Sequence, residues 1–372
     1  MSSTSASIRV LVVEDSLTVR RRICDVLAAE PGFEVVGEAA DGKRGIELCA
    51  LLKPDVITMD MMLPVMTGLA ATEYIMAHSP TPILIVSAST NRGELFKTYD
   101  ALAAGAVDVL DKPSGEEPDG VWEAKFFSAL RVVSRIRVIT HLRGKARPRA
   151  AEGQPPPASP SASASASATA TATACKTDVV AIGASTGGPG AVVEVLRALP
   201  PAFDLPILLV LHIGESFGAA LAEWLDAQTH RRVAYAVEGA PVTAARGRVA
   251  MAPPGAHLVV RNGRMHLTRD PERHSCRPSV DVLFESIGPV YGSSAVACLM
   301  TGMGRDGARG LLDIRHAGGM TIAQDEATSV IYGMPREAVL LGAAEHILPL
   351  GQIGPALRAL GGLEPARDSR RP

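Results

Sequence analysis

A low-complexity tract divides the chain and constrains its fold more than any other feature of the sequence. Residues 150–174 consist almost entirely of Ala, Ser, Thr and Pro and include the run SASASASATATATA. This composition lacks the large apolar side chains that build a packed core, so we expect a flexible linker, assigned to residues 143–177. The segments on either side of it must each fold around a core of their own.

The segment before the linker alternates short apolar runs with amphipathic stretches. This pattern predicts a flavodoxin-like (βα)5 domain with a doubly wound parallel sheet over residues 8–130, whose last helix continues to about 142. Ligands of such sheets bind at the carboxyl ends of the strands. Strands are predicted over Ile8–Val13, Glu34–Ala39, Asp55–Met59, Pro82–Ser87 and Ala106–Leu110, and helices near 17–29, 42–52, 68–77, 92–104 and 121–142.

Carboxylates, a hydroxyl and a lysine collect at these predicted strand ends. Glu14 and Asp15 follow the first strand and Asp60 follows the third. Three neighbouring carboxylates repel one another unless a hard cation such as Mg²⁺ lies among them. Ser87 ends the fourth strand and Lys112 follows the fifth. Each residue alone could be a turn former, but together they favour a site in which Asp60 takes a phosphoryl group.

The segment after the linker, residues 178–360, also predicts a doubly wound α/β domain with a mainly parallel sheet. Its stretch 239–270 is rich in Gly, Pro and short β-like runs, which predicts a β-hairpin excursion. Strands are predicted over Asp178–Gly183, Pro206–His212, Arg231–Val237, His257–Arg261 and Ala295–Thr301, and helices after Pro189, after Ser216, over 281–287 and 306–316, and after Pro335.

A serine in a glycine-rich turn is the strongest single signal in this segment. The run VVAIGASTGGPG over 179–190 ends a predicted strand at Gly183, places Ser185 in the turn and opens a helix at Pro189. A phosphate-binding loop would need Lys followed by Ser or Thr, and a dinucleotide fingerprint would need Gly in place of Ser185. The turn by itself leaves two interpretations open, a nucleophile and a structural turn.

Two further strand ends favour the nucleophile. His212 ends a predicted strand, and Asp306 lies in a glycine-rich loop that follows another. Alone, such residues are usually structural. Together with Ser185 they suit a Ser-His-Asp relay, in which His212 takes the serine proton and Asp306 orients the imidazolium. Backbone N–H groups near Thr186 or Met303 could form the oxyanion hole.

Both segments resemble known families at these positions. The first is similar to the receiver domain of two-component response regulators, on its strand-end residues and the motif MDMMLPVMTG around Asp60. The second is similar to the catalytic domain of the chemotaxis methylesterase CheB family, on the motifs GASTGG, RPSVDVLF, TGMGRDG and YGMPR and on the strand-end His212. The order of the two domains is also that of the family.

The resemblance implies a phosphorylation-activated protein-glutamate methylesterase, and also a glutamine deamidase, that acts on methyl-accepting chemotaxis receptors. It implies a CheA-like sensory histidine kinase as phosphodonor, Mg²⁺ in the receiver domain and no cofactor for the esterase. We further expect a cytoplasmic monomer that binds no nucleic acid and does not insert into a membrane.

The resemblance also assigns roles to individual residues. For the esterase it implies a nucleophile at Ser185, a base at His212, an acid at Asp306 and an oxyanion donor at the Met303 amide. For the receiver it implies phosphorylation of Asp60, a switch formed by Ser87 and Lys112, and Mg²⁺ held by Asp15, Asp60 and the carbonyl of Met62, with Glu14 assisting through water.

Two departures from the family bear on regulation. Val109 stands where many receivers have the rotating Tyr or Phe of the switch, and the low-complexity tract is long for the family. Our hypothesis is that the unphosphorylated receiver covers the face that carries Ser185, and that phosphorylation of Asp60 weakens this contact.

Charge and cysteine content exclude several other classes of protein. Lys and Arg total 37 and Asp and Glu 39, a net charge of −2, which argues against a protein that coats nucleic acid. No signal peptide is visible, and the longest apolar runs are far short of the ~20 residues that span a bilayer. The five cysteines form no CxxC pair, which argues against a zinc ribbon or dithiol site and favours a reducing cytoplasm: Cys24, Cys49, Cys175, Cys276 and Cys298.

Three alternatives remain at this stage. A transcriptional regulator would explain the arginine-rich stretch 131–149, but no helix-turn-helix pattern follows it. A scaffold that has lost catalysis would not need the complete triad. A serine hydrolase of small esters is the third alternative, and lipid substrates for it would fit poorly with an aromatic content of only 4%.

Overall fold

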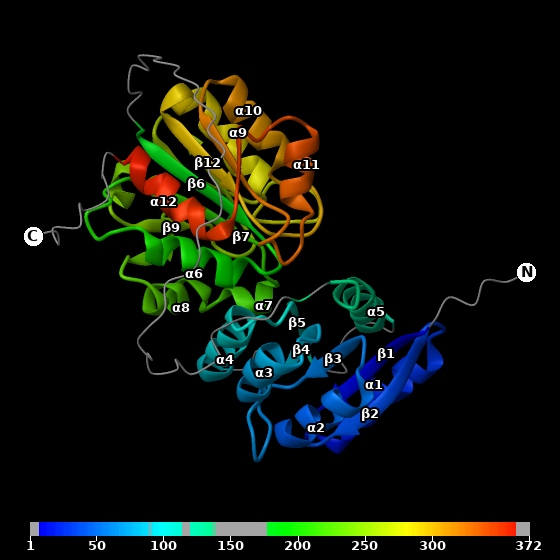
Figure 1. Cartoon of the computed structure of the whole chain (residues 1–372). Coiled ribbons are helices and arrows are strands. Elements are labelled where there is room, and N and C mark those ends of the chain that lie inside the picture. The colour runs from blue at the N-terminus through cyan, green and yellow to red at the C-terminus, as the bar shows by residue number, and fades with distance from the viewer. Residues whose placement is uncertain (1–6, 89–90, 114–119, 137, 139–176, 362–372) are drawn as a thin grey trace, which may run out of the picture.

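Two α/β units make up the computed structural model, which describes residues 7–88, 91–113, 120–136, 138 and 177–361 (Figure 1). The predicted linker up to residue 176, with Cys175, lies outside the described residues, and so does most of the arginine-rich stretch. Among the helices of the described ranges, none is long and apolar enough to cross a membrane.

The N-terminal unit is a five-stranded parallel sheet with the order β2-β1-β3-β4-β5, as the sequence predicts for a receiver-like fold. Its strands are β1 (Ile8–Val13), β2 (Phe33–Ala39), β3 (Val56–Met59), β4 (Ile83–Ser87) and β5 (Asp108–Asp111). Its helices are α1 (Leu17–Ala29), α2 (Gly42–Leu52), α3 (Gly68–His78), α4 (Arg92–Ala103) and α5 (Val121–Val133).

Local sequence signals explain where these helices begin. Ser16, Asp41, Thr67 and Asn91 are N-caps whose side chains each accept a hydrogen bond from a backbone amide of the first turn. The central strands are buried on both faces, because helices cover the sheet from either side.

Helix α5 ends at Val133, earlier than the expected end near residue 142. Its buried stripe consists of Trp122, Phe126, Leu130 and Val133, and Ile136 and Val138 beyond the helix still pack against the same core. Ser134 caps the end, and the chain turns through residues 134–135. The apolar spacing therefore continues past the end of the helix, which is why the sequence predicts a longer one.

The C-terminal unit is a seven-stranded parallel sheet with the order β14-β13-β12-β6-β7-β9-β8, together with a separate antiparallel hairpin. The strands of the sheet are β6 (Val179–Ala184), β7 (Ile207–Leu211), β8 (Val233–Tyr235), β9 (Val249–Met251), β12 (Ala295–Leu299), β13 (Met320–Gln324) and β14 (His346–Leu348). The hairpin is β10 (His257–Arg261) and β11 (Arg264–Thr268), within the predicted excursion 239–270.

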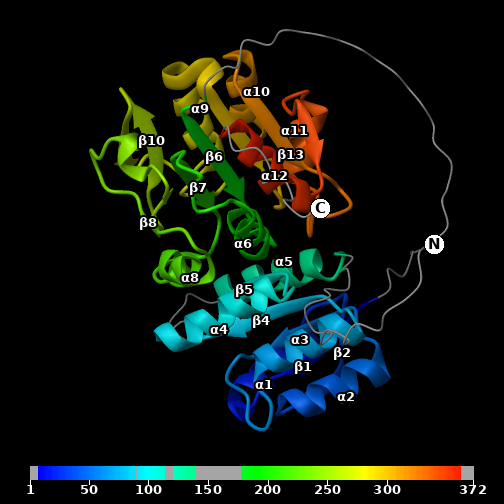
Figure 2. The ribbon, with the colours of Figure 1, turned by 60° about the vertical axis from the view of Figure 1, so that its left-hand side comes forward.

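Helices cover both faces of the seven-stranded sheet (Figure 2). One face packs against α6 (Gly188–Ala198), α8 (Leu221–Gln228) and α12 (Leu350–Leu360), and the other against α9 (Val280–Tyr291), α10 (Ala308–His316) and α11 (Met334–Leu340). A short helix, α7 (Glu215–Gly218), follows β7. The remaining short elements are the 3₁₀ turns Val242–Ala245 and Gly292–Ser294.

The strand order fixes where chemistry can occur. Strand β6 lies between β7 and β12, and all three run in the same direction. Their carboxyl ends therefore meet at one edge of the sheet, where the chain leaves β6 toward β7 on one side and has β12 on the other. Such a switch point is the usual ligand site of an open α/β sheet.

Candidate active site

Ser185 follows the last residue of β6 and is held there by backbone hydrogen bonds. Its amide donates to the Thr301 carbonyl over 3.0 Å, and its own carbonyl accepts from the Gly188 amide over 2.7 Å. Gly187 has φ +77°, and a Cβ there would lie 2.5 Å from Cβ of Val330. The turn therefore needs this glycine, and it leaves Ser185 partly exposed at the N-terminal side of α6.

His212 follows β7 and forms a buried pair with Asp306. Its Nε2 lies 2.9 Å from Oδ2 of Asp306, and both side chains are largely buried. Burial opposes the charged imidazole, but its hydrogen bonds with Asp306 and Cys276 outweigh this and raise the pKa of His212 to about 9. Burial also opposes ionisation of Asp306, yet the hydrogen bond and charge of His212 hold the pKa of this carboxyl below its usual range.

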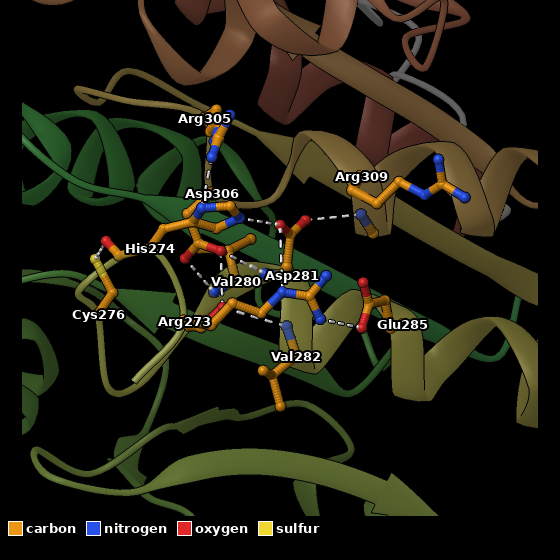
Figure 3. Close-up of polar contacts among 12 residues, drawn as sticks. Arg273, His274, Cys276, Val280, Asp281, Val282, Glu285, Arg305, Asp306 and Arg309 are labelled. Atoms are coloured by element: carbon orange, nitrogen blue, oxygen red, sulfur yellow. Dashed lines mark hydrogen bonds and ion pairs between the residues drawn. The ribbon is translucent and has the colours of Figure 1, made fainter. Parts of the chain in front are cut away.

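A network of donors from the start of α9 fixes Asp306 (Figure 3). Oδ1 of Asp306 accepts from the Ser279 hydroxyl over 2.7 Å and from the Asp281 amide over 3.1 Å, and Oδ2 accepts from the Val280 amide over 2.7 Å. Asp281 is itself fully buried and lies 3.0 Å from Nε2 of His274. With its orientation fixed, Asp306 can hold the imidazole of His212 in one position.

The sequence does not reveal these supporting residues as functional. Ser279 and Asp281 belong to the RPSVDVLF motif, which by itself assigns them no role. The amide of Ser279 donates to Nδ1 of His257 over 3.1 Å. His257 belongs to the hairpin and is fully buried, so this hydrogen bond helps to fix the position of Ser279. These contacts join segments that lie far apart in the sequence, so no local sequence pattern predicts them.

Cys276 is a second unpredicted neighbour of the pair. Its Sγ lies 3.6 Å from Nδ1 of His212, the ring nitrogen that Asp306 does not occupy. A turn in which the amides and carbonyls of Arg273 and Cys276 are mutually hydrogen-bonded positions the thiol.

Ser185, Thr186 and His212 line one cavity of about 620 Å³ with Cys276. Met303, the other oxyanion candidate, is about half exposed and lines an adjacent cleft with α5 residues that include Arg131. The loop that carries Met303 nevertheless contacts the serine turn, because a Cβ on Gly302 would lie 2.7 Å from Cβ of Ser185.

The N-terminal sheet brings its acidic residues and lysine together as well. Nζ of Lys112 lies 2.9 Å from Oε2 of Glu14 and 3.1 Å from Oδ2 of Asp60. One carboxylate oxygen each of Glu14, Asp15 and Asp60 falls within 4.8 Å of the others, a spacing that a single cation could bridge. Burial, and then the charge of Asp60, raise the pKa of Glu14 to about 7; burial also raises the pKa of Asp60.

Ser87 ends β4 beside this cluster, opposite Asp111 at the end of β5, and Val109 lies two residues earlier in β5. The Ser87 side chain is buried, and its hydroxyl has no hydrogen-bond partner among the described residues. The carbonyl of Ser87 accepts from the Lys112 amide over 3.1 Å. Val109 is partly buried and lines the cavity that holds Ser185 and His212, so β5 extends from this cavity to the strand end beside Ser87.

The N-terminal unit closes one side of that cavity. Five of its residues line it together with Ser185 and His212: Leu102, Val107, Asp108, Val109 and Lys125. Figures 1 and 2 both show α4 and β5 facing α6 and α8. The cavity is therefore shared by both units.

Polar contacts from α4 and β5 hold the two units together. Nε1 of Trp224 donates to Oδ1 of Asp100 over 2.8 Å, and the hydroxyl of Tyr99 donates to the Phe217 carbonyl. Tyr99 is fully buried, and its ring centroid lies 5.5 Å from that of Trp224.

Two further polar contacts cross this interface. Arg92 and Glu223 form an exposed ion pair at 2.6 Å. At the end of β5, Oδ2 of Asp111 accepts from the Ser216 hydroxyl of α7 over 2.5 Å.

Comparisons with known proteins match both units. The family described as CheB methylesterase matches residues 180–357, and the family described as response regulator receiver domain matches residues 10–118. Protein-glutamate methylesterase/protein-glutamine glutaminase 2 of Anaeromyxobacter dehalogenans is 44% identical over 95% of this chain and 97% of that protein.

Two further proteins match this chain over nearly their whole length. Protein-glutamate methylesterase/protein-glutamine glutaminase 4 of Geobacter metallireducens is 40% identical over 95% of this chain and 99% of that protein. The crystal structure of the Thermotoga maritima CheB methylesterase catalytic domain is 34% identical, with a TM-score of 0.47, over 50% of this chain and 99% of that one.

Proposed function

This chain belongs to the CheB family, in which a receiver domain precedes a methylesterase domain, and we propose how its residues perform and control the family's activity. The activity is that of a protein-glutamate methylesterase and protein-glutamine glutaminase. The buried His212–Asp306 pair, 2.9 Å apart beside Ser185 at three adjacent strand ends, is the observation that carries the proposal.

Ser185 is the nucleophile in this proposal. Its hydroxyl oxygen attacks the carbonyl carbon of a glutamyl methyl ester while His212 takes the hydroxyl proton. The proton then passes from His212 to the departing methoxide, which leaves as methanol. Water, deprotonated by His212, hydrolyses the acyl-serine and frees the carboxylate. A glutamine follows the same course and releases ammonia.

The oxyanion forms beside the serine turn. A backbone amide there, of Thr186 in the cavity or of Met303 in the adjoining loop, can donate to it. For the base to act, the nitrogen of His212 that now faces Cys276 has to face the serine hydroxyl. Asp306 keeps the other nitrogen engaged throughout, so the imidazolium stays oriented and stabilised.

The receiver's acidic cluster suits Mg²⁺. Three carboxylates within 4.8 Å of one another offer the hard oxygen donors that this ion prefers, and the raised pKa values of Glu14 and Asp60 reflect their crowding and burial. Glu14, Asp15 and Asp60, with the carbonyl of Met62, would hold the ion, which when bound neutralises the carboxylates and the incoming phosphoryl oxygens. Asp60 is the phosphoacceptor, and Lys112 and the unpartnered Ser87 hydroxyl are positioned to contact the phosphoryl group.

Receiver control is supported by the shared cavity. In the unphosphorylated state, α4 and β5 restrict access of a protein substrate to Ser185 and His212. Lys112 contacts Asp60, and its neighbour Asp111 contacts Ser216, four residues after His212. Phosphorylation of Asp60 changes the surroundings of Lys112 and thereby weakens the contact between β5 and α7. A change from 99:1 closed to 99:1 open requires about 5.5 kcal/mol.

The domain pair also indicates the partners. The receiver implies a histidine kinase as phosphodonor, and the methylesterase domain implies methyl-accepting chemoreceptors as substrates. The kinase would contact the N-terminal unit, and the chemoreceptors would contact the C-terminal unit.

Mass spectrometry of a methylated receptor cytoplasmic fragment tests the esterase chemistry. Wild-type protein should convert glutamyl methyl esters to glutamates, and Ser185→Ala should leave them intact. Ser216→Ala, a serine substitution outside the triad, is the control; it loses only the contact with Asp111 and should demethylate at least as fast as wild type. Equal demethylation by wild type and Ser185→Ala would refute the assignment of the nucleophile.

A further inference from the structure

The thiol of Cys276 and the imidazole of His212 meet in a geometry that resembles part of a metal site. Sγ lies 3.6 Å from Nδ1. Bonds of ~2.3 Å from zinc to sulfur and ~2.0–2.1 Å from zinc to nitrogen, at a tetrahedral angle, place the two ligand atoms about 3.5–3.6 Å apart. The two side chains therefore need little movement to share one Zn²⁺ ion.

Asp306 completes the arrangement from the other side of the ring. Histidines that bind metals commonly engage a carboxylate through their second nitrogen, which fixes the ring and makes the ligating nitrogen more basic. Oδ2 of Asp306 occupies that position, 2.9 Å from Nε2 of His212. One potential ligand atom each from His212, Cys276 and Asp306 lies within 4.8 Å of the others.

We propose that Cys276 and His212 bind Zn²⁺ reversibly in the active-site cavity, with Asp306 as the supporting carboxylate. Soft sulfur together with imidazole selects a thiophilic ion of this kind over Mg²⁺ or Ca²⁺. The remaining coordination positions face the cavity and are open to water. On binding, the Cys276 thiol and Nδ1 of the His212 imidazolium each lose a proton to solvent, and a zinc–sulfur and a zinc–nitrogen bond form.

The site acts as an inhibitory one. The metal takes the nitrogen that His212 needs for the hydroxyl of Ser185, so the base is no longer available. A site with two protein ligands holds zinc more weakly than a closed structural site does, and chelation reverses it. Zinc binding does not depend on esterase activity, whereas the inhibitory role rests on the proposed function.

Cobalt(II) substitution tests the binding directly in the full-length protein. Co²⁺ coordinated by a thiolate gives a sulfur-to-cobalt charge-transfer absorption that carboxylate sites, including the receiver's acidic cluster, do not give. Wild type should show this band at one equivalent, and Zn²⁺ should abolish it. Cys276→Ser should lose the band and bind Zn²⁺ at least about tenfold more weakly, because it lacks the soft ligand.

Cys24→Ser is the matched control, since Cys24 is a half-buried cysteine of the receiver with Glu38 rather than a histidine beside it. It should keep the band. Cys276→Ala serves as a second variant, and thermal unfolding establishes that each variant is folded. Absence of the band from wild type, or its persistence in folded Cys276→Ser, would overturn the proposal.

Inhibition is measured separately. Zn²⁺ should suppress ester hydrolysis by wild type and a chelator should restore it, while Cys276→Ser should need at least about tenfold more zinc for the same effect. A zinc-binding protein with no esterase activity under any condition would contradict the proposed function and leave the metal site intact. Inhibition of wild type and Cys276→Ser at the same zinc concentration would overturn the inhibitory role.

Discussion

At the scale of single residues, the proposed chemistry depends on the charge state of His212. The buried Asp306 carboxylate stabilises the imidazolium, and the pKa of His212 rises to about 9 despite the burial of the ring. A general base has to be neutral before it can take a proton from Ser185. The same pair that orients the imidazole therefore keeps most of it protonated at neutral pH.

This predicts a pH profile. Below pH 9 the neutral fraction of His212 grows as pH rises, so kcat/KM should increase by about tenfold per pH unit and level off above about 9. Initial rates of methanol release at several pH values, corrected for hydrolysis without enzyme, measure it. A profile that is already flat between pH 6 and 8 would show that the pair does not hold the proton as described.

The sequence groups the residues of the proposed triad more readily than the residues that support them. Ser185, His212 and Asp306 each follow a strand, and strand ends of a parallel sheet converge, so a local pattern is enough to group them. Cys276 comes from a loop after the hairpin, and nothing local to it indicates that it contacts His212. Ser279 lies within a quoted motif, but its role depends on a tertiary contact with Asp306.

At the scale of secondary structure, the contact between α4 and α8 joins the regulator to the catalytic unit. The exposed pair of Arg92 and Glu223 lies at its rim, whereas Tyr99 and Trp224 are buried within it. Substitutions at the rim can therefore alter the contact without disturbing either core. Exposed pairs contribute ~0–1 kcal/mol, so the expected effects are modest.

Reversing one charge at this rim should favour the open state. Arg92→Glu places two carboxylates opposite each other and should raise basal esterase activity without phosphodonor by up to about fivefold, the change that ~1 kcal/mol produces. The double variant Arg92→Glu/Glu223→Arg restores opposite charges and should return activity to the wild-type level. Unchanged activity in Arg92→Glu, or a double variant as active as the single one, would show that this contact does not limit access.

The elements themselves differ in how well the sequence predicts them. Long amphipathic helices and apolar central strands such as β1 and β7 are found where the pattern indicates. The short strands β9 and β14, of three residues each, and the strand β13 were not predicted. Strand β13 follows two glycines and ends in the buried Gln324, so its apolar pattern is broken; pairing with β12 makes it a strand.

At the scale of the whole molecule, the two units share the cavity that holds the candidate triad. Val109 lines this cavity although it lacks the aromatic ring of many receivers. In the proposed mechanism, control therefore depends on direct coverage of the cavity and on the contact between Asp111 and Ser216, rather than on rotation of an aromatic side chain.

Removal of the receiver should activate the enzyme. Deleting residues 1–174 uncovers the cavity, and for a chain that is 99:1 closed the gain in basal activity would approach about 100-fold. The rate per folded molecule is measured beside the full chain, with circular dichroism to establish folding. Activity that stays the same or falls in a folded deletion variant would contradict inhibition by the receiver.

The most direct test of the whole account is methanol release from methylated receptor fragments, with and without a small-molecule phosphodonor and Mg²⁺. Wild type, Ser185→Ala and Asp60→Asn are compared in the same assay. We predict that release requires Ser185 and that the phosphodonor increases it only when both Asp60 and Mg²⁺ are present. Release that the phosphodonor increases equally in Asp60→Asn, or an absence of release from wild type whose Asp60 accepts phosphate, would contradict the account.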